Sequence, residues 1–535
     1  MKALLHLALA APITLALILT SYRLLLSPSS TLPLRLAALV LTLLTARLLT
    51  SLIQNILYTR RAASLGCGEI PTLPHRDPIL GLDTFAATLS AHRASRLMPF
   101  YQSLFQKHGH TFYTPALGTS VLMTDEPANI QAILATKFDD WPIAGPRLWA
   151  ALPVLGPLSI FASNGHTWRA ARAVLRPSFM RDQVVADGLR CFDRHVRNLL
   201  AAVPVSTDRT KPVVDLQLLF QKMTMDSSTD FLLGHSTDSQ LSADPSALRF
   251  LADFDYASNE SAKLSRLGPL LFYLPHSKLR QATARVRAYI RFYIQKVVAE
   301  RARDKAEGRE PDEKKYVFLD ELLRMGLPED HVVDHVLTIV VAGRDTLAAS
   351  LAAVFYLLAR DPEAVRKLRA EIEAQGVEDP SWEQLRQMKY LNNVVREALR
   401  LFPPVATNGR TSNKETILPR GGGPDGNLPI LVPKGTPIRY SSYCMHRRKD
   451  IYGPDAEEFR PERWETLRVE WQYTPFSGGP RICIGQQFAL TQMSYTVYKF
   501  FTKFRTIEAR DDGDPLQKAS LTFSFARGCL VSVGV

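Results

Sequence analysis

The sequence predicts a mainly α-helical protein with small β-sheets, attached to a membrane by its N-terminal segment. Apolar residues recur with helical periodicity over residues 213–316 and 329–360, which predicts a series of helices. Residues 110–124 alternate in character and are rich in β-formers, which predicts a short hairpin. Residues 3–20 are almost wholly apolar, as a membrane-spanning helix requires.

The cysteine content and the net charge limit which kinds of site and partner the protein can have. The 535 residues carry a formal net charge of +13 and five scattered cysteines. No C-x-x-C pair occurs, so we expect neither a disulfide framework nor a cysteine-rich zinc site, and a reducing compartment fits. A positive charge suits nucleic acid, anionic lipid or an acidic protein. Because the charges are mixed along the chain, we expect a membrane and an acidic protein partner, and no nucleic acid.

Two apolar runs form the expected anchor. Residues 3–20 are just long enough for a bilayer, which takes about 20 residues, whereas residues 32–57 reach that length only by including Arg47. A cleaved secretory signal is the competing interpretation of the first run, and one span or a two-span hairpin both fit. Residues typical of membrane interfaces flank these runs, namely Tyr22, Tyr58, Arg60 and Arg61.

These features divide the chain into two parts. We assign the anchor to residues 1–65 and one globular domain to residues 66–535, with the proline-rich stretch 67–83 as a hinge. Within the domain, the proline-broken stretch 143–161 and the mixed-charge stretch 300–315 are expected to be loops.

Trp168 and Arg172 form a candidate anion site. They are four residues apart, so on a helix they share one face. An indole N–H and a guanidinium that converge on one point can bind a carboxylate. A surface cation–π pair is an equally common result of this spacing.

The helix predicted over residues 329–360 has an unusual centre, Val-Ala-Gly-Arg-Asp-Thr-Leu at 341–347. Gly343 costs about 1 kcal/mol relative to alanine inside a helix. Thr346 can bond back to a carbonyl of the preceding turn and bend the helix. Together they would open a groove that admits a diatomic ligand, with Asp345 beside it. The alternative is an ordinary core helix with a packing glycine.

Glu397 and Arg400 face the same way on a helix, and a buried pair of this kind needs mutual pairing. The E-x-x-R spacing alone is weak evidence, because it also occurs at Glu321–Arg324, Glu363–Arg366 and Glu383–Arg386.

A second pattern, G-x-G-x-x-G within residues 418–426, lacks the strand and helix that a dinucleotide site needs. We interpret it as the loop of a hairpin.

Cys483 lies in a glycine-rich loop, residues 476–485, just before an apolar helix predicted from Gln486 to about Phe500. The positive end of that helix and nearby N–H groups favour a thiolate. Glycines at 478, 479 and 485 let the backbone pass close to a flat or crowded neighbour. Arg481 offers a planar cation for a carboxylate. A thiolate, an arginine and a tight loop suit a haem iron held by one axial sulfur.

The complete pattern F-x-x-G-x-R-x-C-x-G, formed by Phe476, Gly479, Arg481, Cys483 and Gly485, resembles the cysteine-ligand loop of the cytochrome P450 family. The competing interpretation is that Cys483 is a small buried apolar residue. The resemblance extends from about Cys67 to the end of the chain. It implies a mostly helical haem-thiolate domain with small sheets and with a haem cofactor.

The resemblance also implies roles for individual residues. Cys483 would bind the iron, Asp345 would relay protons, and Thr346 would assist oxygen activation. Leu347 departs from the family, where many members carry Thr or Ser. Haem-binding residues would be Trp168, Arg172, Ala342, Gly343, Arg410, Phe476, Arg481 and Gly485. Glu397, Arg400 and Arg463 would support the haem loop structurally.

The implied function is a haem-dependent monooxygenase that hydroxylates a lipophilic substrate with O2. Electrons would come from NADPH through a separate reductase, and the domain would face the cytosol on the endoplasmic reticulum membrane. The loop at 418–426, the Ala-Gly-Arg-Asp-Thr core, and the segment that starts at His446 resemble the fungal branch that hydroxylates alkanes and fatty acids at the chain end.

The substrate stays open at this point. Gly409 replaces a bulkier residue of that branch, which admits a polyketide or terpenoid intermediate instead. We expect Phe402, Val405 and Phe523 to line the pocket. A non-oxygenating isomerase or haem sensor is a more distant alternative, and Asp345 with Thr346 argues against it.

Overall fold

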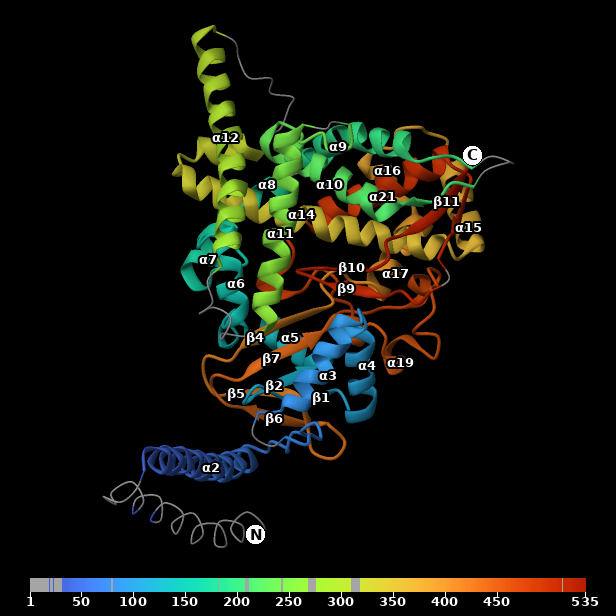
Figure 1. Ribbon diagram of the computed structural model, residues 1–535. Coiled ribbons are helices and arrows are strands. Elements are labelled where there is room, and N and C mark those ends of the chain that lie inside the picture. Colours follow the sequence, from blue (N-terminus) through green and yellow to red (C-terminus); the bar gives the residue numbers. More distant parts are fainter. Residues whose placement is uncertain are drawn as a thin grey trace. The chain divides into compact units, whose positions relative to one another are not determined.

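The computed structural model describes Leu19, Arg23 and residues 31–77, 80–180, 182–206, 211–241, 244–267, 276–308, 318–511 and 513–535 (Figure 1). The first predicted span, residues 3–20, lies outside this part except for Leu19. The chain divides into two compact units. One takes in Met1–Pro71 and Thr416–Val432, the other Thr72–Glu415 and Pro433–Val535.

The smaller unit consists of helix α2 (Leu32–Ser64) and a hairpin of strands β5 (Thr416–Gly422) and β6 (Leu428–Val432). The strands pair antiparallel, with Ile417 opposite Leu431, which confirms the predicted hairpin. The Tyr58 hydroxyl donates to the carbonyl of Leu431 at 2.7 Å, and the Gly68 N–H donates to the carbonyl of Pro429 at 2.9 Å. Helix and hairpin are therefore joined by hydrogen bonds.

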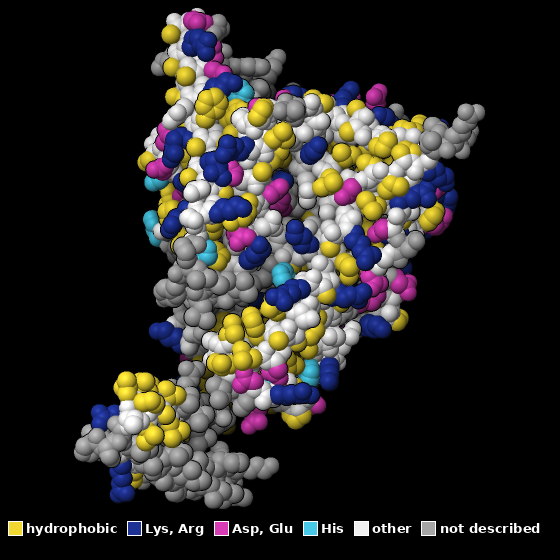
Figure 2. Space-filling model, in the orientation of Figure 1, with side chains coloured by type: hydrophobic (Ala, Val, Ile, Leu, Met, Phe, Trp, Pro, Cys, Tyr) yellow, Lys and Arg dark blue, Asp and Glu magenta, His cyan; other side chains and the backbone are white. Residues whose placement is uncertain are grey.

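Helix α2 exposes apolar side chains over its first half (Figure 2). Its apolar stretch Leu32–Leu43 is shorter than a membrane span. Within the described residues, only Glu329–Leu358 has the length and hydropathy of a spanning helix, and 78% of its apolar window is buried. That helix belongs to the core, and the N-terminal anchor stays a prediction.

Helices form most of the larger unit. The α-helices are α3 (Leu82–Arg93), α4 (Leu97–His108), α5 (Pro127–Gln131), α6 (Pro146–Leu155), α7 (Gly165–Leu175), α8 (Pro177–Met180), α9 (Asp182–Ala202), α10 (Leu216–Leu233), α11 (Pro245–Leu267), α12 (Ser277–Ala306), α13 (Phe318–Arg324), α14 (Glu329–Leu358), α15 (Pro362–Gln375), α16 (Trp382–Gln387), α17 (Lys389–Leu401), α18 (Ser442–Met445), α19 (Lys449–Tyr452), α20 (Arg463–Thr466) and α21 (Gln486–Lys503). Shorter turns are the π-helical η1 (Ala132–Thr136) and the 3-10 turns η2 (Phe138–Asp140) and η4 (Gly479–Arg481). This confirms the mainly helical class.

The largest sheet of the larger unit brings together distant stretches of chain. Its strand order is β1 (Thr111–Ala116), β2 (Thr119–Thr124), β7 (Pro437–Ser441), β4 (Thr407–Thr411). The predicted hairpin at 110–124 is confirmed as β1 and β2. Leu117 and Gly118 join them with positive φ angles of 51° and 75°, as a two-residue turn between twisted strands requires. The remaining strands are β3 (Val214–Asp215), β8 (Thr506–Ala509), β9 (Gln517–Ala519), β10 (Phe523–Phe525) and β11 (Leu530–Gly534).

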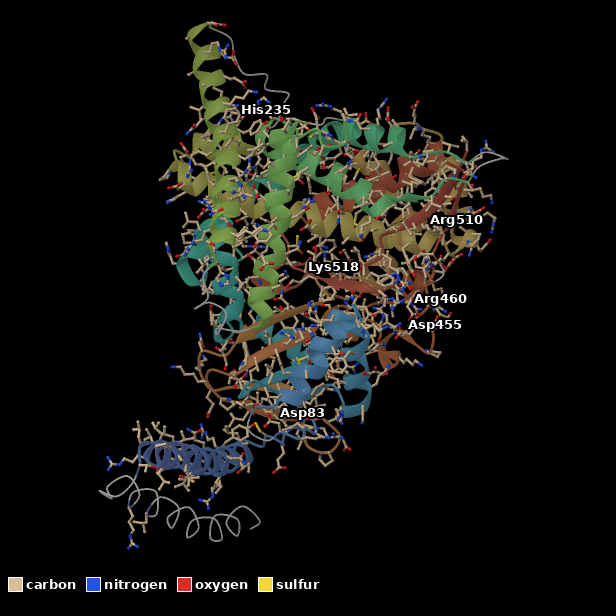
Figure 3. All side chains as sticks on the ribbon, in the orientation of Figure 1. Asp83, His235, Asp455, Arg460, Arg510 and Lys518 are labelled. Atoms are coloured by element: carbon tan, nitrogen blue, oxygen red, sulfur yellow. The ribbon has the colours of Figure 1, made fainter. Side chains whose placement is uncertain are left out.

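The end of the hinge is tied to this unit. Thr72 forms a bridge with Tyr113 of β1, and the Leu73 N–H donates to the Tyr113 carbonyl at 2.8 Å. Asp83, in the first turn of α3 (Figure 3), accepts the N–H of Arg76 at 2.6 Å. The proline-rich stretch therefore follows a fixed path where it enters the larger unit.

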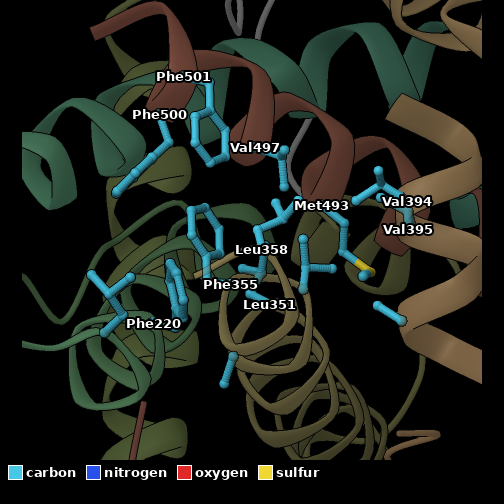
Figure 4. Packing of buried hydrophobic residues seen from close by; sticks show 14 of the residues in the cluster. Phe220, Leu351, Phe355, Leu358, Val394, Val395, Met493, Val497, Phe500 and Phe501 are labelled. Carbon is cyan, nitrogen blue, oxygen red and sulfur yellow. The ribbon is translucent and has the colours of Figure 1, made fainter. Parts of the chain in front are cut away.

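Helix α14 forms the centre of the core. Phe355 of α14 lies against Phe220 of α10 and Phe500 of α21, with ring centroids 5.1 and 4.6 Å apart (Figure 4). Val394 of α17 and Met493 of α21 belong to the same buried cluster. Because α14 is enclosed by helices, its nearly continuous apolar sequence reflects burial on all sides.

Two predicted loops are wrong in part. Residues 143–161 contain helix α6, with Pro153 inside it, because its buried Val154 and Leu155 pack into the core and override the local preference. Helix α12 runs through residues 300–306, and Arg301 forms an ion pair with Asp320 of α13. The mixed charges there mark the solvated side of a helix. Residues 309–315 lie outside the described part.

Glu397 of α17 is the centre of a buried ion network. Arg400 donates to both of its carboxylate oxygens, at 2.9 and 2.7 Å, and Arg463 donates to Oε1 at 3.3 Å. The Trp464 indole N–H adds a bond of 3.0 Å to Oε2. Glu397 and Arg400 are fully buried. The mutual pairing expected of Glu397, Arg400 and Arg463 is thus present, and at the rim of the network Asp455 pairs with Arg463 at 2.9 Å.

His446 connects this network to the segment before the cysteine loop. It is fully buried, and its Nε2 accepts the N–H of Thr474 at 3.0 Å. Burial and the nearby Arg400 lower the pKa of His446 to about 3. The neutral ring therefore carries its proton on Nδ1, which donates to the Arg400 carbonyl at 3.2 Å. Thr474 precedes Phe476 by two residues, so the network fixes where the loop begins.

A Glu397→Gln variant tests this support. It leaves two buried guanidinium groups with a neutral amide, so we expect the free energy of unfolding to fall by about 3–5 kcal/mol. Urea denaturation of the detergent-solubilised full-length protein, followed by circular dichroism, measures the change. Glu363→Gln is the matched control, because Glu363 makes the same bidentate pair with Arg366, at 2.7 and 2.6 Å, on the exposed surface. Equal shifts of the two midpoints would contradict the role of the network.

Candidate active site

A cavity of about 1830 Å³ lies inside the larger unit. Residues of α4, α7, α14, β4, β7 and the loop before α21 line it, and most of its wall is apolar. Pockets for drug-sized ligands usually measure about 300–1,000 Å³. This cavity therefore has room for a large planar cofactor together with a substrate.

The cysteine loop reaches the cavity in a conformation that depends on its glycines. Gly479 has a φ of 63°, and a side chain there would overlap the carbonyl oxygen of Leu134; one at Gly478 would meet the ring of Trp471 at 2.5 Å. At Gly485 a Cβ would come no closer than 3.9 Å to protein. Gly478 and Gly479 therefore have the close neighbours that the sequence predicts. Gly485 instead borders open space in the cavity wall.

Cys483 presents its side chain to the cavity. It is exposed there, while the surrounding protein shields it from bulk water. Burial raises the pKa of the Cys483 thiol, and the Gly485 N–H and the charge of Arg172 offset this only partly. The expected contribution of a backbone N–H to the thiolate is present, at Gly485. A coordinated metal ion deprotonates a thiol outright, so the sulfur suits a metal ligand.

Two arginines enclose Trp168 next to this loop. Trp168 and Arg172 lie on α7, as predicted, and Arg172 donates to the carbonyl of Ile482, which precedes Cys483, at 2.8 Å. The Arg481 guanidinium lies 4.4 Å from the centre of the Trp168 ring and donates to the carbonyl of Ser163 at 2.9 Å. The cation–π alternative describes this cluster, since the Arg172 guanidinium also lies 5.9 Å from the centre of the Trp168 ring, and the carboxylate site stays a prediction.

Arg410 on β4 is buried and carries a donor that the described part of the protein does not satisfy. Its Nη1 bonds within its own strand, to the Gly409 carbonyl at 2.8 Å and the Asn408 side chain at 3.3 Å. Its Nε has no hydrogen-bond partner. A buried guanidinium with an unused donor in a cavity wall suits an anionic group of a ligand. Arg410, Arg172 and Arg481 therefore fit the two propionates of a haem whose iron is bound by Cys483.

Helix α14 contributes Ala342, Gly343, Asp345 and Thr346 to the wall. The Thr346 hydroxyl donates to the Ala342 carbonyl at 2.6 Å, which confirms the predicted bond back to the preceding turn. A Cβ at Gly343 would lie 3.2 Å from the Ser228 hydroxyl of α10. The glycine thus lets α10 and α14 approach closely, as the packing alternative expects, and it also lines the cavity.

Asp345 has an unusual electrostatic environment. Burial raises its pKa, the positive charge of Arg344 lowers it, and Asp255 raises it. Arg344 lies 3.4 Å from Asp345 and forms a close ion pair with Asp255 of α11. Sequence reasoning missed Arg344 and Asp255. An arginine inside an apolar helix signals a partner, yet nothing in the sequence identifies Asp255.

Two of the three residues that we predicted to line the pocket do line it. Val405, Phe523 and also Gly409 line the cavity. Phe402 does not, because its ring packs in the core against Phe525, with centroids 5.3 Å apart. The structure brings the predicted haem-binding residues together in the wall of this one cavity. They are Trp168, Arg172, Ala342, Gly343, Arg410, Phe476, Arg481, Cys483 and Gly485.

Comparison with known proteins agrees with this geometry. Residues 78–527 match the family described as cytochrome P450. The cytochrome P450 monooxygenase himC of Aspergillus japonicus is 40% identical over 473 residues, 87% of this chain and 83% of that protein. The cytochrome P450 monooxygenase FPY7 of Fusarium mangiferae is 37% identical over 477 residues, 87% and 90% of the two chains. Cytochrome P450 52A13 of Debaryomyces hansenii is 37% identical over 468 residues, 83% and 88%.

The match spans the cysteine loop, the central helix and the buried ion network, and the relatives share most of their length with this chain. Family membership implies haem held by a cysteine thiolate, and the cavity residues described above fit that cofactor. The chain belongs to the cytochrome P450 family and is a haem-thiolate monooxygenase.

Proposed function

We propose that this monooxygenase hydroxylates a long-chain fatty acid or alkane at the chain end. The observation that carries the proposal is the mostly apolar cavity, which continues from Cys483 past α14 to the apolar side chains of α4 and the Phe523 turn. A long hydrocarbon chain matches such a wall, because burial of apolar surface drives its binding. The resemblance of the chain to the fungal alkane and fatty-acid branch supports this substrate, as does the similarity to cytochrome P450 52A13.

A second candidate is the oxidation of a bulky secondary metabolite such as a polyketide or terpenoid. Gly409 favours it, because this residue lines the cavity without a side chain. The similarity to the monooxygenases himC and FPY7 is as high as that to 52A13.

In this proposal each cavity residue has a defined task. Bound haem supplies the activation of oxygen and the oxidation of the substrate, and NADPH supplies two electrons through a reductase. Cys483 donates its sulfur to the iron. Arg172, Arg410 and Arg481 hold the propionates, with Trp168 packed against the Arg481 guanidinium. Glu397, Arg400 and Arg463 support the cysteine loop from behind the cavity.

Asp345 delivers protons and Thr346 assists it. Because burial raises the pKa of Asp345, its carboxyl group holds a proton at a higher pH than a solvated aspartate. Thr346 follows Asp345 in the cavity wall, and its hydroxyl donates to the Ala342 carbonyl at 2.6 Å. We assign Asp345 to proton delivery from the α11 side and Thr346 to holding the proton donor in place.

The membrane and the electron donor complete the proposal. The N-terminal apolar runs anchor the enzyme to the endoplasmic reticulum membrane with the larger unit in the cytosol. The net charge of +13 suits an acidic reductase that docks electrostatically.

Replacement of Cys483 tests the cofactor assignment. The reduced wild-type protein with carbon monoxide should show the red-shifted Soret band of a thiolate-ligated haem, and Cys483→Ala should lose it, because the sulfur ligand is gone. Absorption spectroscopy measures both. Cys67→Ala, in the smaller unit, is the control and should keep the band. Persistence of the band in Cys483→Ala would exclude this ligand.

Replacement of Asp345 tests proton delivery. Activity should fall as the pH rises through the raised pKa of Asp345, since only the protonated acid can donate. Asp345→Asn should lower turnover by about 10²-fold or more and lose that pH limb. In Asp255→Asn a charge that raises the pKa of Asp345 is removed, so the limb should move to lower pH. Turnover against pH with a saturating substrate measures these effects, and an unchanged profile in both variants would contradict the assignment.

A titration of the haem spin state tests the substrate class. Palmitic acid and hexadecane should shift the spectrum, because they displace water from an apolar cavity, and oxidation of palmitic acid should give the terminal alcohol. Mass spectrometry of the products locates the hydroxyl group. A response to bulky polycyclic compounds alone would favour the secondary-metabolite alternative.

A further inference from the structure

Arg439 of β7 is a cation in the wall of the cavity with a neutral partner. Its side chain is partly buried, and its Nη1 donates to the Tyr101 hydroxyl of α4 at 2.5 Å. The guanidinium also lies 5.8 Å from the centre of the Tyr101 ring. Among the described residues, no Asp or Glu forms an ion pair with Arg439, whereas Arg344 on α14 pairs with Asp255.

The surroundings of Arg439 are apolar. Leu97, Met123 and Phe523 line the cavity and belong to one hydrophobic cluster that includes Tyr101, and Leu104 packs against this cluster. A partly buried guanidinium uses few of its donors here, and an anion placed beside it would compensate its desolvation.

No side chain stands directly opposite Arg439 on the neighbouring strand β4. Its cross-strand partner on β4 is Gly409. Residues directly opposite one another in an antiparallel pair share a face of the sheet. Gly409 lines the cavity without a side chain, and a Cβ there would lie 3.1 Å from the carbonyl oxygen of Ile438. This close fit explains why a glycine stands opposite Arg439.

Arg439 is not one more haem-binding arginine. Arg410 follows Gly409 on β4 and lies opposite Ile438. Side chains alternate between the two faces of a strand, so Arg410 and Arg439 belong to opposite faces of the sheet. Arg439 therefore extends from the other face of the sheet than Arg410, although residues of both faces line the cavity.

We propose that Arg439 and Tyr101 bind the carboxylate of the substrate, so that the enzyme selects a fatty acid over an alkane. The inference rests on the proposed function, since it names the polar end of the same substrate. The planar guanidinium offers parallel N–H groups that match a carboxylate. Tyr101 accepts a hydrogen bond from Arg439 and keeps its own proton to donate to the ligand. The apolar cluster around them then receives the first part of the acyl chain.

Isothermal titration calorimetry of the holoenzyme with palmitic acid and with 1-hexadecanol tests this subsite. In Arg439→Met, palmitate binding should weaken by roughly 10- to 100-fold, the range expected for a charge-assisted hydrogen-bonded pair, while hexadecanol binding stays unchanged. Tyr101→Phe removes only the hydroxyl group and should weaken palmitate binding by a smaller factor. Lys107→Met is the matched control, because Lys107 also lines the cavity but is exposed, so palmitate binding should not change.

Folding is checked for every variant by the band of the reduced carbon monoxide complex. Should Arg439→Met fail to fold, Tyr101→Phe and Arg439→Lys carry the test, since lysine keeps the charge and loses the planar pair of donors. Equal palmitate affinity in the wild type, Tyr101→Phe and the Arg439 variants would overturn the subsite. Equal affinity of the wild type for palmitate and hexadecanol would also overturn it, yet leave the proposed function intact. If the wild type binds neither ligand, the proposed function itself fails.

Discussion

One buried carboxylate, that of Glu397, holds together the part of the protein on which catalysis depends. It is shared by two guanidinium groups and an indole N–H. The same arginines bind backbone carbonyls of His446, Ala456 and Tyr452, so an otherwise irregular stretch of chain acquires one conformation. Through His446 this order reaches Thr474 and the cysteine loop. The Gly485 N–H of the loop lowers the pKa of Cys483, but burial of the thiol raises it by more. The fold therefore positions the sulfur, and binding of the haem iron is what deprotonates the thiol.

Interactions between residues close in sequence were predictable. The bond from Thr346 to Ala342, the pairing of Glu397 with Arg400, and both hairpins depend on spacing over a few residues. The convergence of the predicted haem-binding residues on one cavity followed from the family resemblance, since their separation in sequence exceeds any local pattern. Arg344, Arg439 and Tyr101 were not predicted. The role of each depends on a hydrogen-bond partner that is distant in sequence. Arg344 pairs with Asp255, 89 residues away, and Arg439 with Tyr101, 338 residues away.

Packing decided the remaining differences. Helix α6 forms despite Pro153, because Val154 and Leu155 are buried in the core. Phe402 is apolar and close to the cavity in sequence, yet the aromatic rings of Tyr356 and Phe525 hold it in the core. Gly409 illustrates the effect of close strand pairing, since a Cβ there would lie 3.1 Å from the carbonyl oxygen of Ile438. The identity of such a residue can be read from the sequence, whereas its effect depends on the strand that pairs with it.

The hydrogen bond from Tyr58 to Leu431 has a practical consequence for protein production. Membrane enzymes are commonly shortened at the N-terminus to obtain soluble material. In this chain, the end of α2 and Gly68 are hydrogen-bonded to the β5–β6 hairpin, although more than 350 residues separate them in sequence. A shortened version that starts after Pro71 would strip the hairpin of these contacts and expose its backbone and apolar side chains. The cut should therefore fall before Tyr58, within the exposed first half of α2.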